Sequence, residues 1–166
     1  MKFDAVISDC GTYRYSLTRV WDKGRGLLVF CMLNPSTADG KENDPTIRKC
    51  IGFAMRLGFG GIHVVNLSAF RAKKPSDLRK AKYAPGPDNL QYLREAFAGN
   101  TVVLAWGAHG AEVPLLARGA RELAKIHADQ VCILRDTKYG HPEHPLMLPY
   151  SCELILLHTK GESHGS

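Results

Sequence analysis

Four short, mostly apolar segments recur along the chain, and a helix-like pattern follows each of the first three. A strand that is apolar at nearly every position is buried on both faces, which is typical of a parallel sheet covered by helices on both sides. The alternation therefore predicts βαβ units and an α/β three-layer sandwich with a mainly parallel, four-stranded central sheet. The predicted strands are residues 27–33, 60–67, 101–106 and 131–134.

The segments between these strands carry helix signals. Asp44 is placed to cap the first helix, Pro45 to begin it and Gly58 to end it. Its apolar stripe is formed by Ile47, Cys50, Ile51 and Ala54. The other two predicted helices are one capped by Asp88, with Leu90, Leu93 and Phe97 on one face, and residues 113–127, with Pro114 in the first turn.

The sequence before the first buried strand has the pattern of an antiparallel hairpin. Residues 13–21 alternate in the manner of a half-buried strand, with Tyr13, Tyr15, Leu17 and Arg19 on one face. The turn-forming residues 22–26 then lead into the apolar run 27–33. We therefore expect an N-terminal antiparallel hairpin, residues 13–33, at the edge of the sheet.

Length and composition predict one globular domain, residues 1–159, followed by a disordered tail, residues 160–166. No stretch reaches the roughly 18–20 apolar residues that span a bilayer, and the N-terminus lacks the apolar segment of a signal peptide. We therefore expect a cytoplasmic location and no membrane partner. The formal charge of +6 is compatible with an anionic partner such as nucleic acid or a nucleotide. The sequence leaves the oligomeric state open.

Cysteine usage argues against disulfides and structural metals. The five cysteines are scattered and include no Cys-x-x-Cys pair. His141, Glu143 and His144 lie close together in sequence, but no further ligand is spaced to join them in a metal site. We therefore predict no metal, no cofactor and no disulfide.

Polar clusters follow each of the four predicted parallel strands. The carboxyl ends of parallel strands meet at one edge of a sheet, and open α/β sheets bind their ligands at that edge. Four clusters on one edge therefore predict a ligand site. The clusters are Asn34–Thr37, Asn66–Arg71, Gly107–Gly110 with His109 between glycines, and Lys138–Pro145 with His141 and His144.

Each cluster also has a purely structural interpretation. Asn34 and the proline after it would also suit a turn that only ends a strand. The Asn66 side chain would also suit a structural role in which it forms hydrogen bonds with the neighbouring backbone. Arg71 begins a basic stretch with Lys73 and Lys74 that would also suit a solvated surface.

The ordered motifs resemble those of the uracil-DNA glycosylase superfamily. Asn34-Pro35-Ser36 is similar to the Gly-x-Asn-Pro-Gly motif of its mismatch-specific and single-strand-selective branches. Val64–Leu67, with Arg71 and Pro75, resembles the superfamily's second-strand motif. Val102–Gly107 resembles its third-strand motif, and His144–Leu146 resembles its closing His-Pro-Ser motif. The resemblance covers residues 27–148 and implies a uracil-DNA-glycosylase-like fold.

A closer resemblance links the whole chain to an uncharacterised bacterial domain-of-unknown-function family. The shared hallmarks are Leu-Asn-Pro-Ser-Thr-Ala-Asp, Asp-Pro-Thr-Ile-Arg, Val-Asn-Leu-x-Ala-Phe-Arg, Ala-Trp-Gly and Gly-x-Pro-x-His-Pro-Leu. This family resemblance implies no activity.

The glycosylase resemblance implies roles for named residues. The Asn34 amide would orient a water toward the anomeric carbon, and His144, or alternatively His141, would stabilise charge on the departing base. Asn66 would read the base edge, and Phe70 or Trp106 would stack on the base if they are not core residues. Phosphate and anion contacts would come from Arg71, Lys73 and Lys74, with Ser36 and Thr37 offering hydroxyls and backbone donors.

Several departures from the superfamily pattern bear on catalysis. Met32 and Ser36 replace two motif glycines, the four-cysteine iron–sulfur set is absent, and Asn34 stands where the most active branch has an aspartate. Three interpretations follow: a base- or nucleotide-binding protein that hydrolyses an N-glycosidic bond, a non-catalytic nucleotide or single-stranded nucleic-acid binding module, and a hydrolase or transferase of a small nucleotide-like metabolite.

Overall fold

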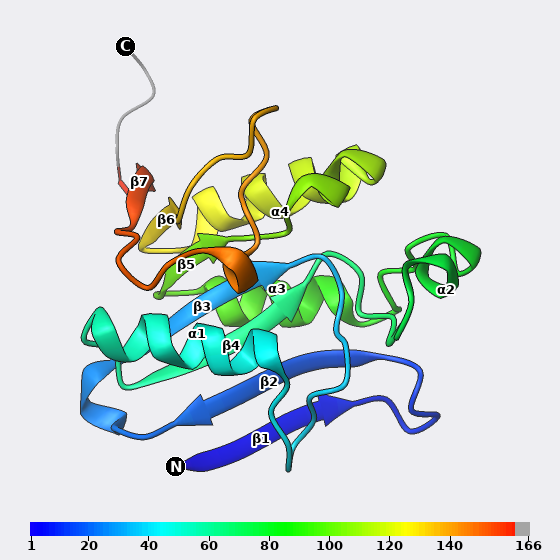
Figure 1. The fold of residues 1–166 in the computed structure, drawn as a ribbon, viewed down its shortest axis with the longest axis horizontal. Coiled ribbons are helices and arrows are strands. Elements are labelled where there is room, and N and C mark those ends of the chain that lie inside the picture. The colour runs from blue at the N-terminus through cyan, green and yellow to red at the C-terminus, as the bar shows by residue number, and fades with distance from the viewer. Residues whose placement is uncertain (162–166) are drawn as a thin grey trace.

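Residues 1–161, which the computed structural model describes, form a mixed α/β fold around a seven-stranded sheet (Figure 1). The strand order is β1-β2-β4-β3-β5-β6-β7. Neighbours pair in parallel from β4 through β3 and β5 to β6, whereas β1, β2 and β7 pair antiparallel. The strands are β1 (Lys2–Ile7), β2 (Arg14–Val20), β3 (Leu27–Met32), β4 (Gly61–Asn66), β5 (Thr101–Leu104), β6 (Gln130–Ile133) and β7 (Ile155–Thr159).

Helices cover both faces of this sheet (Figure 1). The α-helices are α1 (Pro45–Arg56), α2 (Pro75–Lys80), α3 (Asn89–Phe97) and α4 (Pro114–His127), and the 3-10 helices are η1 (Lys23–Arg25), η2 (Ala108–Glu112) and η3 (Pro145–Met147). The predictions of α1, α3 and α4 are confirmed. Asp44 caps α1 by accepting the Ile47 N–H at 2.8 Å, but the Asp88 side chain forms no capping bond on α3.

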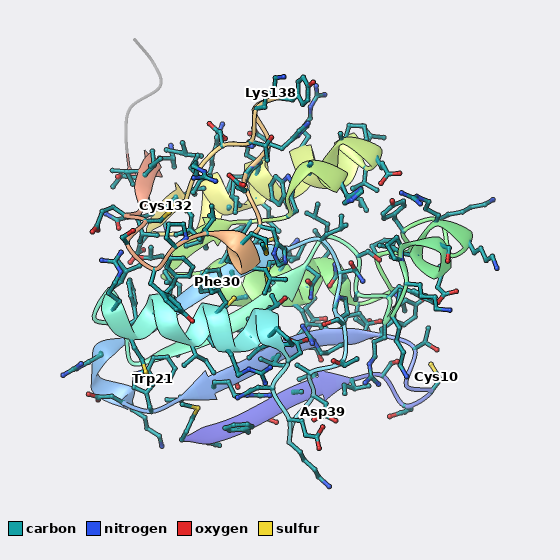
Figure 2. The ribbon with its side chains drawn as sticks, viewed as in Figure 1. Cys10, Trp21, Phe30, Asp39, Cys132 and Lys138 are labelled. Carbon is teal, nitrogen blue, oxygen red and sulfur yellow. The ribbon has the colours of Figure 1, made fainter. Side chains whose placement is uncertain are left out.

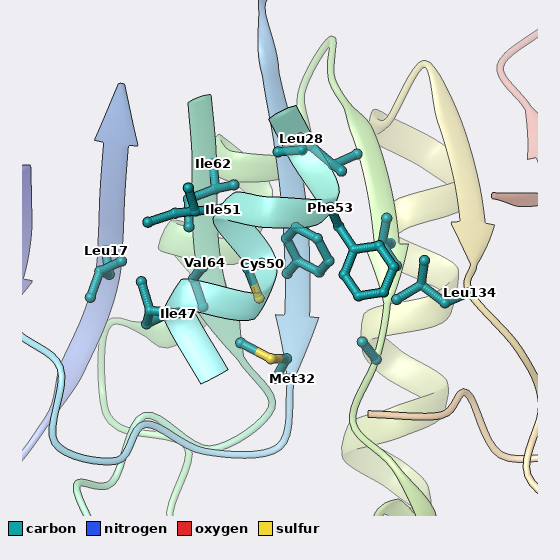
Figure 3. Packing of buried hydrophobic residues seen from close by; sticks show 14 of the residues in the cluster. Leu17, Leu28, Met32, Ile47, Cys50, Ile51, Phe53, Ile62, Val64 and Leu134 are labelled. Atoms are coloured by element: carbon teal, nitrogen blue, oxygen red, sulfur yellow. The ribbon is translucent and has the colours of Figure 1, made fainter. Parts of the chain in front are cut away.

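The core lies in two layers, one on each side of the sheet. Against one face, α1 buries Ile47, Cys50 and Phe53 on Leu28 of β3 and Val64 of β4 (Figure 3). Phe53 is fully buried, and burying such a side chain contributes about 1.5–3 kcal/mol. On the other face, α3 and α4 pack residues such as Phe97 and Ala124 against Val29 of β3, Val65 of β4 and Val102 of β5.

The predicted hairpin of residues 13–33 is wrong. β2 pairs with β1 and β4, in the register Leu17 opposite Val64, and does not pair with β3. Gly60, just before β4, explains this arrangement because its backbone accepts the N–H groups of Trp21 and Asp22 at 2.9 Å each. A Cβ at Gly60 would overlap the Asp22 carbonyl. The turn thus packs against the start of β4, which lies between β2 and β3.

The structure adds two edge strands that the sequence did not indicate, β1 and β7. β1 alternates between exposed and half-buried residues, and Ile155, Leu156 and Leu157 of β7 are exposed. Most of the tail predicted to be disordered, residues 160–166, lies outside the described residues. No helix within residues 1–161 is long and apolar enough to cross a membrane.

Candidate functional site

A cavity of about 230 Å³ lies beside the carboxyl end of β3. We call it the Asn34 cavity. Five residues predicted to contact a ligand line it together: Asn34, Ser36, Lys73, Lys74 and His109. The other lining residues are Leu33, Ala72, Pro75, Leu78, Arg79, Tyr83 and Glu112.

Asn34 follows β3 after one residue and is half-buried. Its side-chain NH₂ donates to the Pro35 carbonyl at 2.9 Å. Its Oδ1 atom accepts no hydrogen bond from a residue of the described chain. The amide is therefore held by its own backbone with a carbonyl oxygen left to accept from a water or a ligand.

Glu112 joins the two walls of the Asn34 cavity. Its carboxylate accepts from the Tyr83 hydroxyl at 2.7 Å, from Arg79 Nε at 3.2 Å, and faces His109 Nδ1 at 3.1 Å. The hydrogen bond from Tyr83, with those from Arg79 and His109, lowers the pKa of Glu112 below its ordinary value and outweighs a smaller opposing effect of burial. With Nδ1 directed at Glu112, the Nε2 atom of His109 is left for a ligand.

Tyr83 reaches Glu112 through an unusual backbone conformation. Lys82 and Tyr83 have φ values of 54° and 53°, in the left-handed region that side chains other than glycine rarely adopt. Such residues cost on the order of 1–3 kcal/mol each and gather at functional sites. The Tyr83 N–H bonds the Leu78 carbonyl at 3.0 Å, which helps to hold the turn after α2 in place.

The Asn34 cavity is electropositive. Lys73 and Lys74 are exposed and form no ion pair with a residue of the described chain, and Arg79 is shared with Glu112. Three cations and one carboxylate leave excess positive charge at the opening. This charge favours an anionic ligand group such as a phosphate.

Asp44 fixes the segment that carries Asn34 and Ser36. Its buried carboxylate accepts from the Ser36 hydroxyl, from the Ala38 N–H at 3.3 Å and from the Ile47 N–H at 2.8 Å. Burial alone would raise its pKa, but these hydrogen bonds and Arg14 together lower it. Arg14 is 2% exposed and donates to the Ala38 carbonyl at 2.9 Å. The site segment thus depends on a buried ionic cluster.

His144 occupies the N-cap of η3, next to the end of β5. A Cβ at Gly107 would lie 3.4 Å from the His144 Cβ. Burial lowers the pKa of the His144 imidazole, and the Asp44 carboxylate partly opposes this shift. Its Nδ1 accepts the Leu146 N–H at 3.2 Å, so the neutral ring carries its proton on Nε2. His144 is a neutral hydrogen-bond donor, but it is not a lining residue of the Asn34 cavity.

Asn66 is buried without any hydrogen bond to its side chain. It ends β4 opposite Met32 of β3, is 1% exposed, and neither Oδ1 nor Nδ2 has a partner among the described residues. The structural interpretation, in which its amide bonds the neighbouring backbone, is therefore wrong. A fully buried amide with no partner is rare, and a bound water or a ligand group would supply the missing hydrogen bonds.

The structure places the remaining predicted residues elsewhere. Arg71 donates to the Gly11 carbonyl at 3.3 Å, Phe70 packs edge-on against Tyr13 with ring centroids 6.3 Å apart, and Thr37 is exposed. His141 lines a second cavity, with Trp106. Figure 2 shows Lys138 at the outer end of the segment that follows β6, far from Phe30 in the interior.

Three residues of the site escaped sequence reasoning: Arg79, Tyr83 and Glu112. None of them directly follows a predicted strand, so the strand-end rule could not find them. Within residues 1–161, no group of three or more His, Cys, Asp or Glu side chains is arranged to hold a metal ion.

Comparison with known proteins identifies a family. Residues 14–146 match the family described as "Protein of unknown function (DUF1643)", and this range includes every predicted site residue. No curated protein and no solved structure matches the chain. The match covers most of the 166 residues. The chain therefore belongs to the DUF1643 family.

Proposed function

We propose that this chain is a uracil-DNA-glycosylase-like protein that binds a nucleobase or nucleotide in the Asn34 cavity. The observation that carries the proposal is the combination of groups on that cavity: the amide of Asn34, the phenol of Tyr83, and the cations Lys73, Lys74 and Arg79. The free Oδ1 of the Asn34 amide suits a water beside a sugar–base bond, and the cations suit a phosphate. A nucleotide presents such a bond and a phosphate to one site.

The arrangement of the sheet supports the same proposal. Parallel strands flanked by helices on both faces bind ligands outside their carboxyl ends, and the Asn34 cavity lies there. The residues that carry the glycosylase resemblance, Asn34, Asn66 and His144, come from segments at or after the ends of β3, β4 and β6. In a uracil-DNA-glycosylase-like layering these segments together form the ligand site.

Hydrolysis of the N-glycosidic bond is the reaction we propose for this ligand. Asn34 Oδ1 would accept a hydrogen bond from the attacking water and orient it toward the anomeric carbon. The C1′–N bond breaks, its electron pair stays on the departing base, and the water oxygen bonds C1′. One proton of the water passes to the base, so that free base and a C1′ hydroxyl result. The glycosylase resemblance implies His144 as the donor to the departing base, a role worth on the order of 3 kcal/mol. Because His144 does not line the Asn34 cavity, the base would have to extend beyond that lining to reach its Nε2 proton.

Incubation with oligonucleotides tests the proposal. The wild-type protein should bind single-stranded oligonucleotides in a salt-dependent manner. It should also release base from strands that contain uracil, hypoxanthine or a mismatch, detected by alkaline cleavage at the abasic product. Binding without cleavage would select the non-catalytic binding module, and neither result would leave the small-metabolite hydrolase or transferase.

Replacing Asn34 with alanine should separate binding from chemistry. We expect base release to fall about tenfold or more, because the water loses its orienting acceptor, whereas oligonucleotide affinity should stay within about twofold. Single-turnover base release and fluorescence anisotropy measure the two quantities. Asn100→Ala is the matched control, since Asn100 precedes β5 at its amino end and bonds Ala96. Unchanged base release in Asn34→Ala would remove Asn34 from the mechanism.

A further inference from the structure

A second cavity, of about 350 Å³, lies on the other side of η2 from the Asn34 cavity. We call it the Trp106 cavity. Its lining includes Trp106, Gly110, Arg118, Arg121 and His141. Arg118 and Arg121 are on α4, Trp106 follows β5, and His141 belongs to the segment after β6. The cavity thus shares the segment after β5 with the proposed nucleotide site and adds the segment after β6.

The indole of Trp106 forms the wall of this cavity against η2. Trp106 is 3% exposed, and a Cβ at Gly110 would overlap the indole ring. Glycine at this position therefore lets η2 lie directly on the indole. Since η2 also carries His109 and Glu112 on the Asn34 cavity, one short helix separates the two cavities.

The Trp106 cavity is electropositive as well. Neither Arg118 nor Arg121 forms an ion pair with a residue of the described chain. The Arg121 guanidinium lies 5.7 Å from the Trp106 ring centroid, within cation–π range. The one carboxylate of the lining, Glu122, is 3.5 Å from Lys125 and is thereby partly neutralised. Unpaired guanidinium groups suit a phosphate, and the contact with the Trp106 ring positions Arg121 for one.

The two cavities form a single basic band across η2. Their cations are Lys73, Lys74, Arg79, Arg118 and Arg121, against the carboxylates Glu112 and Glu122. A free mononucleotide would occupy one cavity and leave the other without a role. A polyanion that crosses η2 would use both sets of cations.

We propose that the Trp106 cavity binds a second nucleotide of the same single strand, next to the one held in the Asn34 cavity. This inference rests on the proposed nucleotide-binding function and names its ligand class as single-stranded nucleic acid. Arg118 and Arg121 contact the phosphate that links the two nucleotides, and His141 contributes a polar contact at the far wall. The band gives a charge-based affinity that a mononucleotide lacks.

The experiment compares ligands of increasing length. Thymidine 5′-monophosphate and oligothymidylates of two and four nucleotides are titrated against the full chain by calorimetry at several salt concentrations. We expect the tetramer to bind about tenfold or more tightly than the mononucleotide. Arg118→Ala should weaken tetramer binding about fivefold and reduce the salt slope by about 0.7, the contribution of one single-strand phosphate contact. It should leave mononucleotide affinity unchanged.

The control is Arg94→Ala, which removes an exposed arginine from α3 that lines neither cavity. It should change no affinity. Equal affinities for the mononucleotide and the tetramer, or equal weakening of both by Arg118→Ala, would overturn the second subsite while the nucleotide-binding proposal stands. If no nucleotide of any length binds, the proposed function fails and the subsite fails with it. Because Arg118 is exposed, misfolding is not expected, and thermal denaturation verifies this.

Discussion

Replacing Asp44 with alanine should lower the free energy of unfolding by about 4 kcal/mol. The substitution removes the α1 cap, which is worth about 1–2 kcal/mol, and the charged acceptor for Ser36 and Ala38. It also removes the carboxylate whose field favours the charged form of the buried Arg14 guanidinium. A buried cation that loses its counter-charge is strongly destabilising. Urea unfolding at neutral pH measures the loss.

Two variants divide this effect into its parts. Asp44→Asn keeps an oxygen for the Ile47 N–H but removes the charge, so it should cost about half as much. Ser36→Ala removes only the hydroxyl donor and should cost about 1 kcal/mol. An Asp44→Ala loss of 1 kcal/mol or less would mean that Asp44 acts as a helix cap alone.

The same cluster should appear in the pH dependence of stability. The pKa of Asp44 in the fold is below its ordinary value of 3.8, so the unfolded chain takes up the proton first as pH falls. The stabilisation is therefore complete well above pH 3.8 and is lost as pH falls through the pKa of the folded state. Asp44→Asn lacks this carboxyl group, so its free energy of unfolding should fall less steeply than that of the wild type as the pH is lowered.

Local sequence patterns were enough to predict the positions of individual helices and strands. α1 could be placed because Asp44, Pro45 and an apolar stripe agree, and the buried strands could be placed because runs such as 101–104 have no polar face. The strand order could not be predicted in this way, because the turn-forming residues 22–26 are equally compatible with a hairpin that the structure does not form. The neighbour of β2 is decided by Gly60, almost forty residues along the chain, whose missing Cβ lets β4 begin against that turn.

The candidate site divides in the same way. Asn34, Ser36 and His109 could be grouped from sequence because each follows a parallel strand, and the geometry of such a sheet brings those ends to one edge. Arg79 and Tyr83 could not be grouped with them. They reach the cavity from a short helix and from a turn with positive φ that directly follows no predicted strand, and their hydrogen bonds to Glu112 join them to the cavity wall.

Replacing Asn66 with leucine should stabilise the protein and weaken ligand binding. The Asn66 side chain is 1% exposed, and its donor and acceptor have no partner among residues 1–161. A buried polar atom without a partner costs about 1–3 kcal/mol, so a leucine of similar volume should raise the free energy of unfolding by about 2 kcal/mol. If the amide reads a base edge, the same change should weaken oligonucleotide binding about tenfold or more, because the bidentate contact is lost.

Asn89 provides the matched control, because it is equally buried but its Nδ2 donates to the Asn66 carbonyl at 2.8 Å. Asn89→Leu removes a formed hydrogen bond and should therefore destabilise the fold by about 1–2 kcal/mol. Opposite signs for two identical substitutions at two buried asparagines would mark Asn66 as a residue kept for binding at the expense of stability. A destabilised Asn66→Leu protein that still binds oligonucleotides would show instead that the amide has a structural role, and Asn66 would leave the site.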